Sequence, residues 1–268
     1  MMRRPIRKSR KIDRVTDALI RSRIRKIKPT SARMCTMFLY VIDGRVSEAV
    51  CRAYASDRRT VARGPRGTDA KIEVWYPPQF TSVEDAFKAQ RDDGVKRVYP
   101  AVVFTVATAK RRGRPRYCAV PLDPTMEPWA MELMKYFEEH GDDEVFPITR
   151  QRVWERSKKV WRDLLYVIED YSVVLNKGGT GIESIDAETT EEKRRSVRVD
   201  RHPRDWTLHA LRHLRASDLV DHYGFTGANL SSFGGWTIGT AMRVSSSVGR
   251  YLDLDWRAYF AKFLKPRY

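Results

Sequence analysis

The sequence predicts a mainly helical α+β fold that contains one small three-stranded antiparallel sheet. Apolar residues recur at helical spacing over most of the chain, whereas three short segments between residues 71 and 122 are rich in β-branched and aromatic residues. With 268 residues, of which 42% are hydrophobic, the chain can build one large domain or two modest ones. We divide it into a basic arm, residues 1–30, and a main domain, residues 31–268.

The arm is predicted to be helical. Lys and Arg are dense in this segment, and its apolar residues lie at loosely helical spacing. The positive charges either bind DNA phosphates, with affinity gained from counterion release, or form a merely solvated helix surface. The residues that we assign to DNA binding are Arg3, Arg4, Arg7, Lys8, Arg10 and Lys11.

The main domain is expected to open with a buried pair of helices. Thr30 or Ser31 is a suitable N-cap for a helix over the apolar segment ARMCTMFLYVI. Helical structure is expected to continue through RVSEAVCRAY.

The sheet follows these helices. Its strands are predicted at KIEVWY (71–76), RVYPAVVFTVAT (97–108) and RYCAVPL (116–122). Between the last two, AKRRGRP has the composition of a turn, which puts Lys110 at or beside the tip of a basic β-hairpin. The hairpin residues that we assign to DNA binding are Arg111, Arg112 and Arg114.

Helices predominate after the sheet. Met126, Trp129, Leu133 and Phe137 share one helical face, and a longer amphipathic helix is predicted over residues 153–168. Residues 176–205 are polar and without periodicity, as in a long loop insertion. Helical spacing resumes at residue 206, and a last helix is predicted within residues 252–268.

Charge and cysteine content bound the function. The chain has 51 Lys and Arg against 34 Asp and Glu, a formal charge of +17, which suits a polyanionic partner and makes nucleic acid the first expectation. Cys35, Cys51 and Cys118 form no C-x-x-C pair and are too few for a disulfide framework. No apolar run approaches the ~18 residues of a membrane span, and no secretory signal is present. We expect a cytoplasmic, nucleoid-associated protein without membrane contact.

One cluster carries reactive side chains. His209, Arg212 and His213 are three and four residues apart, so they lie on neighbouring faces of a helix. Two histidines at this spacing occur in zinc proteases, but that motif requires Glu after the first His, where this chain has Ala210. We therefore expect no metal, which leaves a reactive cluster or a charged helix surface.

The segment LHALRHLRASDLV resembles the H-x-x-R-H box of the tyrosine recombinase (phage integrase) family. In that family the box is followed by a Gly-His or Gly-Trp pair and then by the nucleophilic tyrosine; here Gly235-Trp236 and Tyr251 follow. Upstream, GRVSEAV resembles the first arginine box, R-[IV]-S-E, at Arg45 and Glu48.

The family also places a lysine on a β-hairpin between these boxes, and Lys110 occupies the matching position. The resemblance covers about residues 31–262, and four boxes in the same order are far more specific than any one of them. It implies that the main domain is the family's catalytic domain.

The sequence departs from the family at two points. Tyr251 follows Trp236 by 251 − 236 = 15 positions, which is longer than usual. Tyr251 is still preferred because RYLDLDW resembles the family's R-Y-x-x-L context, which Tyr223, Tyr259 and Tyr268 lack. The 30 residues before the main domain are too few for the family's separate DNA-clamping domain, so we expect a catalytic fragment or a minimal enzyme.

The resemblance implies a role for each residue. Arg45 and Arg212 would hold the phosphate oxygens and stabilise the charge of the transition state, as bidentate guanidinium groups can. Lys110 would give a proton to the leaving 5′ oxygen, and His209 would assist proton movement at the nucleophile. Trp236 would pack and donate through its indole N–H, while His213 and Glu48 support the site. Glu48 alternatively pairs with Arg52 at i, i+4.

The expected function is site-specific recombination or integration of double-stranded DNA through a 3′-phosphotyrosyl intermediate, with neither ATP nor metal. Strand exchange between two duplexes implies a homo-oligomer, as a tetramer on DNA. The apolar face of the last helix would dock on a neighbouring protomer or on its own core. This face consists of Trp256, Tyr259, Phe260 and Phe263.

Two alternatives stay open. A monomeric relaxase of the topoisomerase IB type uses a similar set of residues. A non-catalytic DNA-binding relative would retain the fold while the long Trp236-to-Tyr251 spacing keeps the tyrosine from the phosphate.

Overall fold

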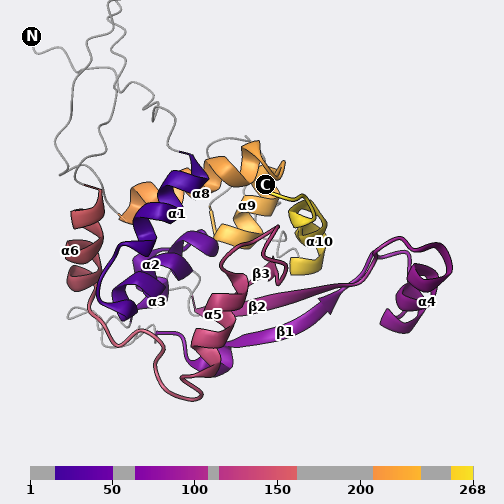
Figure 1. Ribbon diagram of the computed structural model, residues 1–268, viewed down its shortest axis with the longest axis horizontal. Coiled ribbons are helices and arrows are strands. Elements are labelled where there is room, and N and C mark those ends of the chain that lie inside the picture. The colour runs from indigo at the N-terminus through magenta and orange to yellow at the C-terminus, as the bar shows by residue number, and fades with distance from the viewer. Residues whose placement is uncertain (1–15, 51–63, 108–114, 162–207, 237–254, 268) are drawn as a thin grey trace, which may run out of the picture.

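The computed structural model describes residues 16–50, 64–107, 115–161, 208–236 and 255–267. Within these ranges the protein is a mainly helical α+β structure with one three-stranded antiparallel sheet, which confirms the predicted class (Figure 1). No described helix has the length and apolar character needed to cross a membrane.

The sheet has the order β1 (Ala70–Trp75), β2 (Tyr99–Ala107), β3 (Pro115–Pro121). Each strand lies within two residues of its prediction because β-branched and aromatic residues fit a half-buried pleated surface. In the central strand, Val103 lies opposite Lys71 on one side and Ala119 on the other. Residues 108–114, which include Lys110, Arg111, Arg112 and Arg114, lie outside the described residues.

Two helices cover one face of the sheet, α2 (Thr30–Val41) and α5 (Ala130–Glu138). The ring of Phe104 on β2 lies 5.3 Å from that of Phe38 and 5.1 Å from that of Phe137, measured between centroids. Met126, Trp129, Leu133 and Phe137 are all buried, as predicted, but the helix begins at Ala130, so Met126 and Trp129 precede it.

The C-terminal segment packs along β3, an edge strand of the sheet. Helix α9 (Gly227–Gly234) and helix α10 (Trp256–Phe260) contact β3, and a 3₁₀ turn (Ala261–Phe263) follows α10. The four aromatic residues of the predicted last helix are at most 4% exposed in the same chain. Within this single chain the face docks on its own core, which is one of the two arrangements expected. Docking on a neighbouring protomer stays a prediction.

Four more helices surround these layers: α1 (Asp17–Arg25), α3 (Val46–Ala49), α6 (Arg150–Val160) and α8 (Leu208–Asp221). The N-cap of α2 is Pro29, one residue before the predicted Thr30. Helix α2 does not continue into α3, because the chain turns at Asp43, whose φ is +52°.

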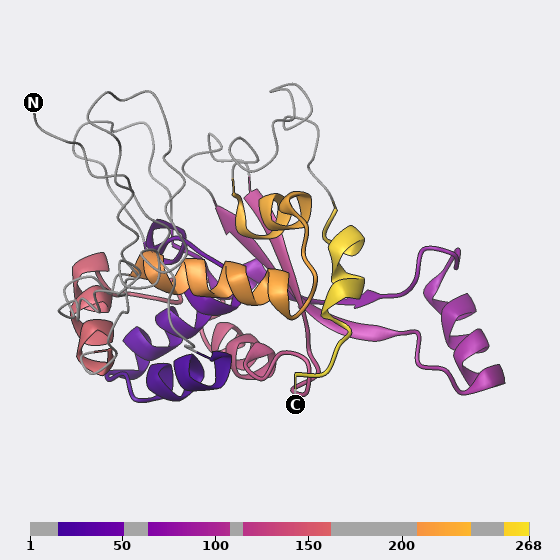
Figure 2. The same cartoon turned by 90° about the horizontal axis from the view of Figure 1, so that it is seen from above.

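Helix α4 (Val83–Asp93) was not predicted. It connects β1 to β2 and stands away from the body of the molecule in two perpendicular views (Figures 1 and 2). Its apolar stripe is short, with Val83, Ala86 and Phe87 at helical spacing, and only Ala86 is buried. Its signals are at its ends: Ser82 caps the first turn, and Gly94 ends the helix at φ +70°.

A buried ion network ties α8 to the rest of the domain. Glu127 is fully buried and pairs with Arg21 of α1 and with Arg215 of α8, both at 2.7 Å. Burial alone would raise the pKa of Glu127, but the two guanidinium groups hold it below its usual value. The other members of the network are Asp17, Asp218 and Arg267.

Candidate functional site

Helix α8 presents the predicted cluster on two faces. His209 and His213 are exposed one turn apart, and their Nε2 atoms lie 3.1 Å from each other. Arg212 points into the protein, where it is 1% exposed. The structure therefore confirms that the three residues occupy neighbouring faces, and it separates the exposed histidines from the buried arginine.

The predicted Gly-Trp pair lies directly against this helix. Helix α9 ends at Gly234, and Gly235 reverses the chain in the left-handed region, at φ +65°. A Cβ atom at position 234 would overlap the carboxylate of Asp43, so only glycine fits there. The ring of Trp236 packs over Arg212, whose Cζ lies 4.3 Å from the ring centroid, and beside His213.

The two predicted arginines meet at this turn. Arg45 Nη2 donates to the carbonyl of Gly235 at 3.0 Å, and Arg212 Nη2 donates to the carbonyl of Gly234 at 2.6 Å. Residues that are 212 − 45 = 167 positions apart thus bind consecutive carbonyl groups. The guanidinium groups share one site although they come from different helices.

Glu48 holds Arg45 in place. Arg45 is the N-cap of α3, and its backbone N–H donates to Glu48 Oε2 at 2.7 Å while its Nη1 lies 3.5 Å from Oε1. The second partner of Glu48 is Arg116 of β3, at 3.0 Å. Burial favours the protonated acid, but Arg116 lowers the pKa of Glu48 below its usual value. Arg52, the other expected partner, lies outside the described residues.

Arg116 is a site residue that the sequence prediction missed. It is 2% exposed, and its Nη1 donates to the carbonyl groups of Ile42 and Phe233. It therefore joins the sheet to the segment before Arg45 and to the helix before the Gly-Trp turn. A signal was present: Arg116 alternates with Cys118 and Val120 on the inward face of its strand, where a charge requires a partner.

Asp43 was also missed. Its carboxylate is fully buried and accepts the indole N–H of Trp236, and its Oδ1 lies 4.0 Å from Arg212 Nε. Burial raises the pKa of Asp43 to about 7, although Arg212, the Trp236 hydrogen bond, Arg116 and Arg215 all act to lower it. The Asp-Gly turn before the arginine box was the available sequence signal.

The site contains hydrogen-bonding atoms that the described residues leave unpaired. Arg212 Nε and Nη1, Asp43 Oδ1 and Arg116 Nε are buried without a hydrogen-bond partner among them. Each unpaired buried polar group costs about 1–3 kcal/mol. Burial also lowers the pKa of Arg212 to about 10, which still leaves it cationic at neutral pH. The site therefore has guanidinium donors for an anion, covered by the ring of Trp236.

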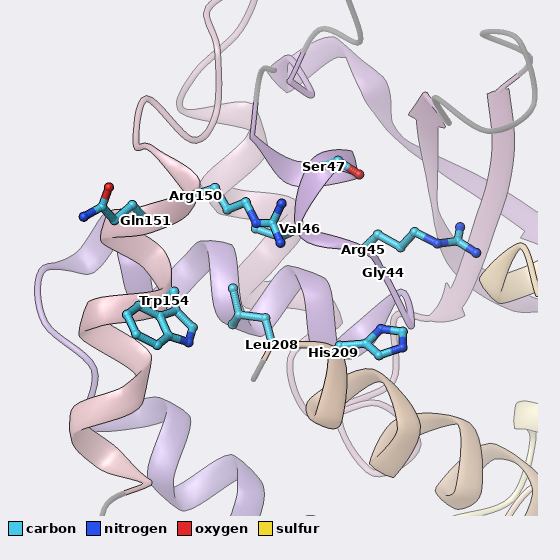
Figure 3. Close-up of a pocket in the computed structure, with 9 residues that line it drawn as sticks. All are labelled: Gly44, Arg45, Val46, Ser47, Arg150, Gln151, Trp154, Leu208 and His209. Atoms are coloured by element: carbon cyan, nitrogen blue, oxygen red, sulfur yellow. The ribbon is translucent and has the colours of Figure 1, made fainter. Parts of the chain in front are cut away.

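A pocket of about 510 Å³ opens beside this site. Arg45 and His209 line one end, and Arg150, Gln151 and Trp154 of α6 line the other (Figure 3). The remaining lining residues are Gly44, Val46, Ser47 and Leu208.

Several predicted residues are not placed. Tyr251, Lys110 and the DNA-binding residues of the arm and the hairpin lie outside the described ranges. The alternative nucleophiles Tyr223 and Tyr259 are 1% and 0% exposed, and their hydroxyl groups donate to the carbonyls of Met126 and Tyr117. Both have structural roles here. Tyr268 lies outside the described residues.

Within the described residues, no group of three or more His, Cys, Asp or Glu side chains is arranged to hold a metal ion. No family model matches the chain, and no curated protein or solved structure matches it at a significant level. The sequence motifs and the geometry of the site are therefore the features that point to a function.

Proposed function

We propose that the protein is a tyrosine-type DNA strand transferase, a site-specific recombinase or integrase, with Tyr251 as its nucleophile. The observation that supports this most is the meeting of Arg45 and Arg212 at the Gly234–Trp236 turn, with His209 on the same helix as Arg212. The boxes that resemble the family's arginine, histidine and Gly-Trp motifs come from separate segments. Their convergence is what a shared phosphate site requires.

Electrostatics explains why two arginines are needed. A phosphodiester repels an anionic nucleophile, and its transition state carries additional negative charge on the non-bridging oxygens. Arg45 and Arg212 would bind these oxygens. Because Arg212 is 1% exposed beneath Trp236, the indole ring has to turn away before Arg212 can reach a phosphate. DNA binding is therefore coupled to a movement of Trp236.

The proposed reaction keeps the number of phosphoester bonds constant. The hydroxyl oxygen of Tyr251 forms a bond to phosphorus as the bond to the 5′ oxygen breaks, and His209 assists removal of the tyrosine proton. Lys110 donates a proton to the leaving 5′ oxygen. A 5′ hydroxyl of another strand then attacks the phosphotyrosyl bond and releases the tyrosine.

Covalent trapping tests this proposal. We expect denatured mixtures of the protein with nicked duplex DNA to contain a DNA-linked band that is absent in Tyr251→Phe. The control is Tyr117→Phe, at a residue that is 51% exposed, and it should retain the band. Arg212→Lys should reduce adduct formation by about 100-fold, because an ammonium group cannot replace a bidentate guanidinium. A band that persists in Tyr251→Phe would move the nucleophile to another tyrosine. Tight, salt-sensitive binding without any band would favour the non-catalytic relative.

A second candidate is topoisomerase-like relaxation by a monomer. The observation in its favour is the burial of the C-terminal aromatic face in its own chain, so this face needs no second protomer to cover it. The four residues are Trp256, Tyr259, Phe260 and Phe263. The same preparation would be incubated with supercoiled circles. Relaxation without recombinant products would favour the monomeric enzyme, whereas recombinant products would favour a tetramer on DNA. A tetramer of this kind would act in the nucleoid.

A further inference from the structure

We propose that the pocket between α6 and α8 is a nucleobase subsite, in which a base next to the bound phosphate leaves the DNA stack and lies against Trp154. The proposal adds a base-binding pocket to the site described above. It rests on the proposed function because it assumes that the ligand is DNA.

The dimensions of the pocket suit a nucleotide. Its volume of about 510 Å³ lies within the range of roughly 300–1,000 Å³ that is usual for small-molecule sites. Arg45 and His209 stand at one end and the α6 residues at the other, with Val46 and Leu208 between them (Figure 3). A phosphate at the Arg45 end would therefore place its attached sugar and base toward α6.

The lining at the α6 end has the chemistry that binds bases. Trp154 offers an aromatic ring, and base stacking on aromatic side chains is a general mode of binding unpaired nucleotides. Arg150 and Gln151 are exposed at the start of α6 and carry the guanidinium and amide groups that bind base edges in pairs of hydrogen bonds. Lys158 Nζ lies 4.8 Å from the centroid of the Trp154 ring and adds positive charge near this end.

The alternative occupant of the pocket is a sugar-phosphate backbone alone. A backbone would need the cations but would gain nothing from Trp154 or from the apolar walls of Val46 and Leu208. The combination of cations at one end with an aromatic ring and an amide at the other favours a whole nucleotide. Because extrusion of a paired base costs a few kcal/mol, the subsite also implies preference for weakly paired steps.

The test compares two probes that share one phosphodiester. Thymidylyl-thymidine carries both bases, and its abasic analogue carries none, so neither requires a target sequence or cleavage. We expect the abasic probe to bind the full-length protein at least about tenfold more weakly, which corresponds to one stacked base. Trp154→Ala should remove this difference and Trp154→Phe should largely keep it. Lys159→Ala, at an exposed position of α6 outside the pocket lining, should not change it.

Three outcomes would each contradict the nucleobase subsite. They are equal affinity of the two probes, no binding of either probe, and a base dependence that remains in Trp154→Ala. Denaturant unfolding of every variant identifies one that fails to fold. The two probes compared on the wild-type protein then still decide whether a base adds affinity. The outcome is independent of covalent trapping: a protein that forms the Tyr251 adduct without base dependence keeps the proposed function and loses the subsite. Base dependence without an adduct would support the subsite and contradict the proposed function.

Discussion

Asp43, Glu48, Arg116 and Arg212 are all buried in the candidate site, although each has an ionisable side chain. Burial of a charge is costly unless it is paired, and here the pairing is uneven. Glu48 contacts two arginines, whereas Asp43 has one oxygen without a hydrogen-bond partner among the described residues. Asp43 is therefore the residue at which pH should act.

The direction of this effect follows from the pKa of Asp43, which burial raises to about 7. In the unfolded chain an aspartate has a pKa of about 3.9. Between these values the folded protein retains a proton that the unfolded chain has lost. The contribution of Asp43 to the free energy of unfolding therefore falls as pH rises from about 4 to about 7 and stays constant above.

Asp43→Asn keeps an oxygen for the Trp236 indole and removes the titration. We expect the free energy of unfolding of the variant minus that of wild type to increase from about pH 4.5 to about pH 7.5, a range that roughly spans the titration of Asp43. Urea titrations at each pH measure this difference. Asp142→Asn, at an exposed loop position, is the matched control and should show no such trend. A difference that is constant with pH would contradict the assignment.

The position of α8 depends on charged side chains from other elements. Arg215 of α8 and Arg21 of α1 both pair with Glu127, which precedes α5, and no solvent reaches this carboxylate. Since Arg212 lies one turn before Arg215, a shift of α8 at the network would move the catalytic candidates as well.

Glu127→Gln should therefore be strongly destabilising. It removes the carboxylate that Arg21 and Arg215 share, and each arginine keeps one other acidic partner. The loss of one partner of a buried ion pair costs about 3–5 kcal/mol. Glu132→Gln makes the same change in α5 at a side chain that is 37% exposed and pairs with Arg25. There the expected cost is at most about 1 kcal/mol. Equal effects of the two substitutions on urea unfolding would rule out a structural role for the network.

The C-terminal helix belongs to the core of its own chain. Phe263 is fully buried, within 5.5 Å of the rings of Tyr223, Phe225 and Phe233. Phe263→Ala should lower the free energy of unfolding by about 3–5 kcal/mol, as expected for loss of a buried phenylalanine.

Phe87 of α4 is 45% exposed and provides the comparison. Phe87→Ala should cost about 0.5 kcal/mol or less, as for most surface substitutions. Unfolding curves that are the same for both alanine variants, together with a change of oligomeric state in Phe263→Ala, would instead indicate that the C-terminal face joins protomers.

Across the whole molecule, the charge of +17 is spread unevenly, since α4 carries four carboxylates against two cations. The site, with Arg45 and Arg212, lies in the body, while α4 stands apart at the far end of β1 and β2 (Figures 1 and 2). If DNA lies over the site, charges on α4 should contribute less to binding than charges in the N-terminal segment.

Salt dependence of DNA binding separates these contributions. Each phosphate contact contributes about 0.9 to the slope of log K against log salt concentration. We expect the double substitution Arg3→Gln and Arg4→Gln to reduce this slope by about 2. Lys88→Gln with Arg91→Gln, the charge-matched pair on α4, should leave the slope nearly unchanged. A larger effect of the α4 pair would move the DNA to the other end of the molecule.

Local structure could be predicted from the sequence alone. Segments rich in β-branched and aromatic residues located β1, β2 and β3 within two residues, and helical spacing of apolar residues located the buried face of α5. It also singled out Arg45, Arg212 and Trp236, which the structure brings together. These features depend on neighbours in the chain, whose spacing is directly visible in the sequence.

The contacts between distant residues, in contrast, became visible with the three-dimensional fold. Nothing local indicates that Arg116 pairs with Glu48, that Asp43 lies beneath Trp236, or that the C-terminal aromatic residues turn back onto β3. Helix α4 was missed because its apolar stripe is limited to Val83, Ala86 and Phe87, of which only Ala86 is buried. Contacts between distant segments depend on how all elements pack at once, and that packing sets which charges are buried and how strongly their pKa values change.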